Sequence, residues 1–196
     1  MSVQEDGMQK RRIEVEPWST EWAARYAEAR VALERVWPEA RAWHHIGSTA
    51  VQGLSAKPTI DILVVLPRGI DVEARHPRMA ELSYDCRGEC LDAPQPGMPG
   101  RFYFVLRDGS VHRVHVHVVH EGHFEIELLL GVRDYLRGNA DARARYGALK
   151  TSLARANRYD NFGYMRGKDA AVRELVEAAR DWQRTLNAAI AGEEAS

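Results

Sequence analysis

The chain has few of the features that mark secreted or membrane proteins. Only two of its 196 residues are cysteine, Cys86 and Cys90, and a secreted disulfide framework would normally contain more. The longest apolar run, residues 60–67, contains Asp61 and is far shorter than the ~20 residues of a membrane-spanning helix. Residues 1–12 are polar and lack the apolar core of a signal peptide. These absences predict a cytoplasmic protein that does not associate with a membrane.

The chain also lacks an excess of charge of either sign. Lys and Arg number 27 and Asp and Glu number 28, which gives a formal net charge of −1. No overall basic field attracts nucleic acid, so any nucleotide contact must be local. The apolar fraction of 45% is typical of a globular domain. We expect residues 1–12 to be disordered and residues 13–190 to form a single domain.

Hydrophobic periodicity predicts helices at both ends of the chain and strands between them. A helix beginning at Ser19 or Thr20 carries an apolar stripe made of Trp22, Tyr26, Ala29, Leu33 and Trp37. Strands are predicted over residues 41–46, 59–66, 101–107 and 111–119, the last two joined at Asp108-Gly109. Further helices are predicted over residues 71–82, 124–137, 141–157 and 168–187, and a loop that can act as a lid over residues 92–100. Pro77 either interrupts the first of these helices or marks a late start, and Glu125 and Glu127 also fit the alternation of a strand. This order predicts an α/β (α+β) domain, with a mixed β-sheet flanked by helices and a helical C-terminal third.

The most informative pattern is a Gly-Ser turn followed by an aspartate inside an apolar strand. Gly47 allows close backbone approach to a phosphate, and Ser48 adds a hydroxyl to the N–H groups of the turn. Asp61 is costly to bury unless it is paired or bound to a metal. The alternatives are an ordinary capped turn and a carboxylate that pairs with that turn, with Lys57 or with Arg113.

A second pattern is the alternation of polar and valine residues over 111–120. A strand would place Arg113, His115 and His117 on one face and the valines on the other. The two histidines can bind a divalent metal, shuttle a proton or hold an oxyanion together with Arg113. The alternative is the solvent-facing side of an edge strand.

Lysine and arginine residues offer local positive charge. Lys57 can meet a phosphate as a point charge, or can be a solvated loop lysine. Residues 150–168 are basic and interleaved with aromatic residues. Such a stretch can close over a nucleotide or contact RNA, although a solvated helix face is its commoner meaning.

These motifs together resemble the GrpB family, a group within the nucleotidyltransferase superfamily. The resemblance runs from about residue 13 to residue 182 and is carried by an ordered set of motifs. They are Pro17-x4-Trp22, His45-Ile46-Gly47-Ser48-Thr49-Ala50-Val51, Gly53-Leu54, Ala56-Lys57-Pro58, Ile60-Asp61-Ile62, His115-Val116-His117-Val118, Arg133-Asp134-Tyr135-Leu136-Arg137, Tyr146-x2-Leu149-Lys150 and Tyr164-x3-Lys168. The superfamily's second carboxylate is replaced by Leu63.

The resemblance implies a nucleotidyltransferase-like fold that binds a nucleoside triphosphate with Mg²⁺ or Mn²⁺ and transfers a nucleotidyl group to an acceptor. The residues expected to bind the nucleotide are Gly47, Ser48, Thr49, Lys57, Arg113 and Lys168, and those expected for catalysis and metal binding are Asp61, His115 and His117. Two alternatives stay open. One is a non-catalytic module that binds a nucleotide, coenzyme A or RNA, and the other is an acyl or aminoacyl transferase on the same fold.

Overall fold

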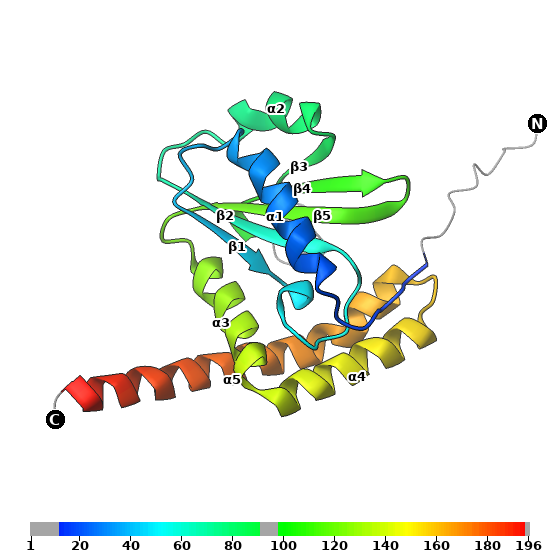
Figure 1. Cartoon of the computed structure of the whole chain (residues 1–196), viewed down its shortest axis with the longest axis vertical. Helices are drawn as coiled ribbons and strands as arrows, with labels where there is room; N and C mark the ends of the chain where they lie inside the picture. The colour runs from blue at the N-terminus through cyan, green and yellow to red at the C-terminus, as the bar shows by residue number, and fades with distance from the viewer. Residues whose placement is uncertain (1–11, 91–97, 195–196) are drawn as a thin grey trace, which may run out of the picture.

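The computed structural model describes residues 12–90 and 98–194 of the chain, with a mixed β-sheet and helices around it (Figure 1). The helices are α1 (Glu21–Glu34), α2 (His76–Glu81), α3 (Phe124–Gly138), α4 (Ala140–Ala156) and α5 (Asn161–Glu194), with short 3-10 turns η1 (Ser48–Ala50) and η2 (Glu73–Arg75). The strands are β1 (Ala42–Ile46), β2 (Ile60–Leu66), β3 (Tyr84–Cys90), β4 (Met98–Asp108) and β5 (Val111–His120). This arrangement confirms the predicted fold class.

The five strands form one sheet in the order β1-β2-β5-β4-β3. Only the β2–β5 pair is parallel, and the other three pairs are antiparallel. The strand with the aspartate and the strand with the histidines are therefore direct neighbours inside the sheet. Because β5 lies between β2 and β4, the alternative of an edge strand for the histidine pattern is excluded.

Each face of the sheet is covered by different helices. The face formed by Ile62, Val116 and their neighbours packs against α1, whose predicted stripe contributes buried Trp22 and Leu33. The opposite face buries Leu63 in a cluster that includes residues of α3. Helices α4 and α5 run side by side at the end of the molecule next to α3 (Figure 1). This second face, between the sheet and the C-terminal helices, is the one that carries Asp61.

Most predicted elements are confirmed, and one strand was missed. The hairpin between β4 and β5 turns at Gly109, which has a φ of 57°, and the segment after residue 124 is helical. Strand β3 was not predicted, although Tyr84 and Cys86 alternate with Asp85 and Arg87. It is an edge strand paired only with β4, where polar side chains are tolerated and protect the open edge.

One helix start agrees with a predicted alternative and another differs. Within residues 71–82, Pro77 marks a late helix start: it lies in the first turn of α2, which begins at His76 after η2. Helix α5 begins at Asn161 instead of Lys168, because a glycine near its start packs against α4 instead of ending the helix. The disorder expected of residues 1–12 falls outside the described residues except at Arg12, and the lid expected over residues 92–100 falls outside them up to residue 97. The last three residues of that expected loop belong instead to strand β4, Met98–Asp108.

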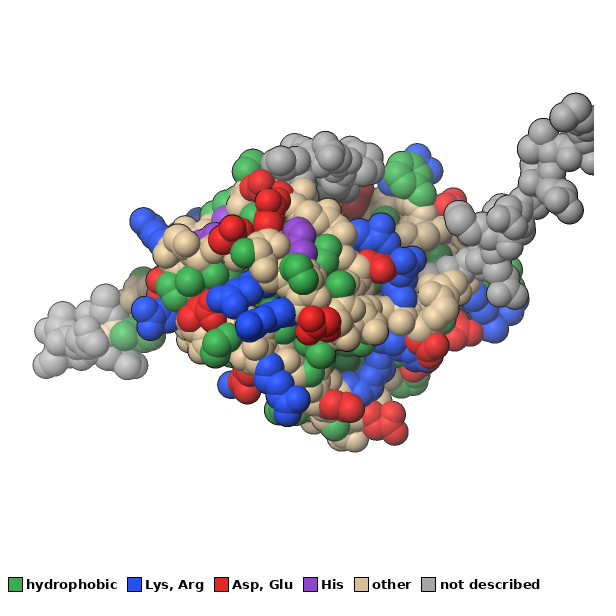
Figure 2. Space-filling model, turned by 90° about the horizontal axis from the view of Figure 1, so that it is seen from above, with side chains coloured by type: hydrophobic (Ala, Val, Ile, Leu, Met, Phe, Trp, Pro, Cys, Tyr) green, Lys and Arg blue, Asp and Glu red, His purple; other side chains and the backbone are tan. Residues whose placement is uncertain are grey.

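Surface charge is mixed. On the face shown in Figure 2, acidic and basic side chains lie among one another and form no area of a single sign. Within residues 12–90 and 98–194, no helix combines the length and the apolar character needed to cross a membrane.

Candidate nucleotide-binding site

Asp61 and the histidines meet because β2 and β5 pair in parallel register. Asp61 lies opposite His115, and Leu63 lies opposite His117. The Asp61 carboxylate Oδ1 is 3.0 Å from His115 Nδ1 and 3.9 Å from His117 Nε2. The structure therefore brings together the three residues that the sequence predicted for catalysis.

A third histidine extends this contact. His112 Nδ1 lies 2.9 Å from His115 Nε2, so His115 bridges His112 and Asp61. An ionised carboxylate only accepts hydrogen bonds, so His115 donates to it from Nδ1. When His115 is neutral, its Nε2 accepts a hydrogen bond from His112. The imidazoles of His115 and His117 also pack against the Tyr103 ring, at centroid distances of 5.3 Å and 5.1 Å.

The Asp61 carboxylate is held in its charged form. Burial alone would raise its pKa, but hydrogen bonding to His115 and the charge of the nearby histidines outweigh burial and hold the pKa of Asp61 well below its usual range. Gly47 packs directly against this carboxylate. Its φ is 68°, and a Cβ atom there would lie 2.4 Å from Asp61 Oδ2. Position 47 therefore requires glycine for two reasons: the positive φ, and the lack of room for a Cβ atom beside Asp61.

Side chains of α3 hold the backbone on both sides of the Gly-Ser turn by hydrogen bonds. Arg137 donates two hydrogen bonds to the Ala50 carbonyl, at 2.8 Å and 3.1 Å. Arg133 donates to the His45 carbonyl at 3.1 Å, and Asp134 pairs with both guanidinium groups. The Arg-Asp-Tyr-Leu-Arg motif therefore positions the turn instead of contacting a ligand.

A cavity of about 360 Å³ opens beside Asp61, within the size range of small-molecule sites. It lies between the sheet, the Gly-Ser turn and the first turns of α5. Its lining residues are Ser48, Thr49, Ala56, Lys57, Thr59, Asp61, Tyr103, His112, His115, Lys150, Asn161, Tyr164, Met165 and Lys168. This cavity unites the Gly-Ser turn, the aspartate and three lysines that are distant in sequence.

The three lysines are held around aromatic rings. Lys57 Nζ lies 4.2 Å and Lys168 Nζ 4.8 Å from the centroid of the Tyr164 ring. Lys57 also donates to Asn161 Oδ1 at 2.9 Å, which joins the loop before β2 to the start of α5. Burial lowers the pKa of Lys168, and the charge of Asp61 partly opposes that effect.

Lys150 is the most unusual group in the cavity. It is 2% exposed, and its ammonium has no hydrogen-bond partner among the described residues. It lies 4.7 Å from the centroid of the Tyr146 ring. Burial, reinforced by the charge of Lys168, lowers the pKa of Lys150 to about 7. The charge of Asp61 opposes this shift only in part. A buried ammonium without a hydrogen-bond partner is costly, so an anion in the cavity would stabilise its charged form.

Close helix packing brings Lys150 and Lys168 to the same cavity. Gly167 in α5 lies so near α4 that a Cβ atom there would be 2.5 Å from Leu153 Cδ2. Gly163 lies equally close to the Asn157 and Asp160 side chains of the α4–α5 connection. Of the two glycines that the sequence prediction left outside the helix, Gly167 therefore allows the α4–α5 contact.

Two predicted ligand-binding residues are placed differently from the others. Arg113 does not line the cavity: its guanidinium pairs with Asp108 at 2.8 Å. The reason is a β-bulge, since the register passes from Leu106–Val114 to Arg107–His112 and leaves Arg113 unpaired. This interrupts the alternation on which the prediction depended, and His112 lines the cavity instead.

Thr49 lines the cavity, but its hydroxyl is used internally. It donates to the Thr59 carbonyl at 3.2 Å and lies 3.0 Å from His45 Nε2. Its placement therefore indicates a structural contact between the turn and the strand. Ser48, Lys57 and Lys168 do line the cavity, as the sequence predicted, while Gly47 supports it through Asp61.

The predicted metal ligands Asp61, His115 and His117 contact one another directly instead of pointing toward one position where a metal ion could bind. Within the described ranges, no three His, Cys, Asp or Glu side chains are grouped so that they could hold a metal ion. The histidine nearest to Asp61 donates its Nδ1 proton to the carboxylate. Asp61 is thus the one oxygen ligand that this cluster offers, which suits Mg²⁺ only when phosphate oxygens and water complete the coordination.

Several lining residues were not among the predicted binding residues, and the most informative of them are Tyr103, His112 and Lys150. Lys150 belonged to a basic stretch whose common meaning is a solvated face, so its burial carried no signal apart from the family resemblance. His112 reaches the cavity only through the bulge, which periodicity does not show.

Comparison with known sequences places the chain among conserved bacterial proteins. The profile of the "GrpB protein" family matches residues 12–178. "UPF0157 protein YqkA" of Bacillus subtilis is 33% identical over 179 residues, covering 91% of this chain and 50% of the relative. "UPF0157 protein PA4798" of Pseudomonas aeruginosa is 34% identical over 173 residues, covering 86% and 68%. The chain therefore spans only half the length of YqkA.

Comparison with solved structures gives the same relationship. The crystal structure of conserved protein GrpB from Enterococcus faecalis has a TM-score of 0.77 and 29% identity, covering 86% of this chain and 99% of that one. Cid1 poly(U) polymerase bound to Mg 3′-dATP has a TM-score of 0.51 and 13% identity, covering 78% and 49%. The second likeness shows a nucleotidyltransferase-like fold and no more than the fold. With its profile match and its relatives, the chain belongs to the GrpB family.

Proposed function

We propose that the cavity binds a nucleoside triphosphate and that the protein transfers the nucleotidyl group to an acceptor. The observation that carries this proposal is the buried, unpartnered ammonium of Lys150, which faces the same cavity as Lys57 and Lys168. When protonated, the three lysines carry three positive charges against one carboxylate, Asp61. The remaining two positive charges match a triphosphate of four negative charges accompanied by one divalent cation.

The individual residues have distinct roles in this proposal. Ser48 and the N–H groups of its turn hold a phosphate, as expected of such a turn. Lys57, Lys150 and Lys168 neutralise the phosphate chain. In the transfer, the acceptor hydroxyl loses its proton to water and its oxygen forms a bond to the α-phosphorus. The bond between the α-phosphorus and the oxygen that bridges to the β-phosphorus breaks, so that pyrophosphate leaves with its charge balanced by the lysines.

Asp61 would hold the divalent cation, with His115 and His117 orienting its carboxylate. A bound cation of this kind neutralises phosphate charge in phosphoryl-transfer sites. The structurally similar Cid1 poly(U) polymerase is known in a crystal structure with Mg 3′-dATP bound, which supports the choice of ligand class.

The alternative is a module that binds the nucleotide without transferring it. Its support is Leu63, which is fully buried with Ile46, Val65 and Val119 where the superfamily's second carboxylate would be. A binding module needs the lysines but not the cation on Asp61. The metal requirement of binding therefore separates the two functions.

The test is a thermal-shift and pyrophosphate-release screen of nucleoside triphosphates, each with and without Mg²⁺ or Mn²⁺. Wild type is compared with Asp61→Asn and Lys168→Met. A ligand at a hundred times its dissociation constant adds about 2.7 kcal/mol of apparent stability. We expect metal-dependent stabilisation that both variants lose, together with pyrophosphate release. Stabilisation that ignores metal and Asp61 would favour the binding module, and the absence of any triphosphate effect would refute both.

A further inference from the structure

Two adjoining hollows on the outer side of α4 lie apart from the nucleotide cavity. The larger, of about 610 Å³, lies between residues 12–16 and the last turns of α4. The smaller, of about 480 Å³, lies between the β1–β2 connection and the middle of α4. Thr151 and Arg155 line both hollows, which therefore form one continuous surface. We call it the α4 track; from Arg143 to Arg155 it extends about 18 Å along the helix axis.

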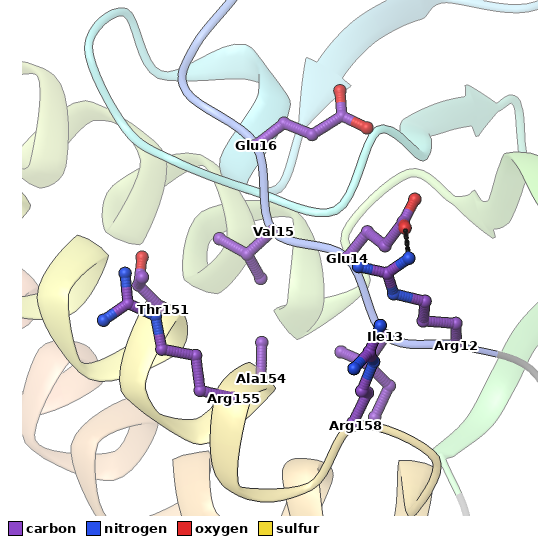
Figure 3. A pocket seen from close by; sticks show the side chains of 9 residues that line it. All are labelled: Arg12, Ile13, Glu14, Val15, Glu16, Thr151, Ala154, Arg155 and Arg158. Atoms are coloured by element: carbon purple, nitrogen blue, oxygen red, sulfur yellow. Dashed lines mark ion pairs between the residues drawn. The ribbon is translucent and has the colours of Figure 1, made fainter.

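Arginines line this track. Arg155 and Arg158 are exposed and have no Asp or Glu within ion-pair distance in the part of the chain that the structure describes. Arg143 donates only to backbone carbonyls, at 2.9 Å and 3.1 Å. Figure 3 shows Arg155 on one side of the larger hollow and Arg158 on the other, with Ala154 between them. The cationic groups are thus available to a ligand.

The acidic groups of the track do not cancel this charge. Glu14 is paired with Arg12 at 3.1 Å, and Glu16 is the other carboxylate that lines the track. The track therefore has four arginines against two glutamates. The molecule as a whole carries a net charge of −1, so this local excess is not a consequence of overall composition.

The floor of the track is made of small side chains and hydroxyl groups. These residues are Gly53, Ser55, Ala144, Gly147, Ala148, Thr151, Ser152 and Ala154. Such a floor allows a ligand backbone to approach closely, and the Ser55 and Ser152 hydroxyls can donate to it, whereas the Thr151 hydroxyl donates to the Gly147 carbonyl at 3.0 Å. The planar guanidinium group matches phosphate oxygens in a bidentate way.

We propose that the α4 track binds the backbone of a single-stranded polynucleotide. Its length and open shape suit a polymer with repeated phosphates better than a compact small molecule. Lys150 of the nucleotide cavity and Thr151 of the track are adjacent on α4, so the track and that cavity lie on the same turn of the helix. As the acceptor of nucleotidyl transfer, the strand deepens the proposed function and rests on it, whereas binding to the track does not depend on transfer.

The test measures binding of fluorescein-labelled single-stranded RNA and DNA of about ten nucleotides by fluorescence anisotropy, without any triphosphate. Wild type is compared with the double variant Arg155→Gln/Arg158→Gln. The charge-matched control is Arg78→Gln/Arg173→Gln, which removes two exposed arginines outside the track. Thermal unfolding of each variant checks that the fold is retained.

We expect the track variant to bind at least about tenfold more weakly, and the slope of log K against log salt to fall by about 1.4, at about 0.7 for each lost phosphate contact. The control should bind like wild type, and preference between the RNA and DNA strands identifies the natural polymer. An equal loss of affinity in the track variant and the control variant would overturn the proposal, and so would the absence of strand binding to wild type at low salt. The proposal would also fail if polyglutamate displaced the labelled strand as effectively as the unlabelled strand does. Triphosphate stabilisation should be unchanged in the track variant, so the proposed function can fail separately.

Discussion

Replacing Lys150 with methionine should make the ligand-free protein more stable than wild type. The same change should reduce the extra stability that the protein gains when an anionic ligand binds. Lys150 is 2% exposed and its ammonium has no hydrogen-bond partner among the described residues. Its pKa falls from 10.5 to about 7 on folding. At 1.36 kcal/mol for each pKa unit, this shift corresponds to a cost of about 5 kcal/mol for keeping the ammonium charged in the folded state.

The sign of the pH dependence follows from proton binding. Below pH 7 the folded and unfolded states both carry the proton, so the full cost is present. Between pH 7 and 10.5 the unfolded state binds more protons than the folded state, and stability rises with pH. Lys150→Met removes this titration, because methionine fills a similar volume without charge. The stability gain of the variant should therefore be largest near pH 6 and should shrink toward pH 9.

Urea unfolding of wild type, Lys150→Met and Lys150→Arg at pH 6 and pH 9 measures this difference. The arginine variant keeps a permanent charge, so it should be no more stable than wild type at either pH. In parallel, inorganic triphosphate should stabilise wild type more than Lys150→Met. A methionine variant less stable than wild type at pH 6 would refute the reasoning, because it would mean that the ammonium has a stabilising partner.

Three further predictions concern the turn and the carboxylate. Gly47→Ala should lower the free energy of unfolding in urea by about 1–3 kcal/mol or more, because its Cβ atom would overlap Asp61. Gly53 also has a positive φ, but the nearest atom to a Cβ there is 3.6 Å away, so Gly53→Ala should lower the free energy of unfolding less. Asp61→Asn should unfold at lower urea concentration than wild type at pH 6, and this difference should shrink as the pH falls from about 4 toward 2, because a lowered carboxyl pKa contributes stability that is fully present above its unfolded value and is lost progressively on acidification. Arg137→Met removes two hydrogen bonds to the Ala50 carbonyl. It should clearly weaken triphosphate binding measured by calorimetry while changing the melting temperature only slightly, and an unchanged affinity would contradict its positioning role.

The sequence predicted the strands of the site well because their patterns are local. The apolar run around Asp61 and the alternation around His115 each specify a strand and its faces without reference to the rest of the chain. The sheet topology makes these two strands parallel neighbours, and no residue pattern within either strand predicts this pairing. The contact between Asp61 and His115 therefore depended on the family resemblance until the structure showed it.

What the sequence could not show depends on tertiary packing. The bulge that turns Arg113 away from the cavity arises from the pairing of β5 with β4. The early start of α5 depends on the space that Gly167 leaves for Leu153. Likewise, a lysine in a basic helix is solvated or buried according to what covers it, and for Lys150 that cover comes from α5 and the sheet.

Leu63 bears most directly on how such a site can work. It is fully buried in an apolar cluster on the same face as Asp61, so a carboxylate there would have to be buried among apolar side chains. The site consequently has one negative charge where a two-carboxylate site has two, and three lysines opposite it. In the proposed function, a phosphate chain in this cavity would be neutralised mainly by the protein's own ammonium groups, with one carboxylate left for a cation. Any catalysis would then depend on the lysines as much as on a metal, which is why Lys150 is the most informative residue to change.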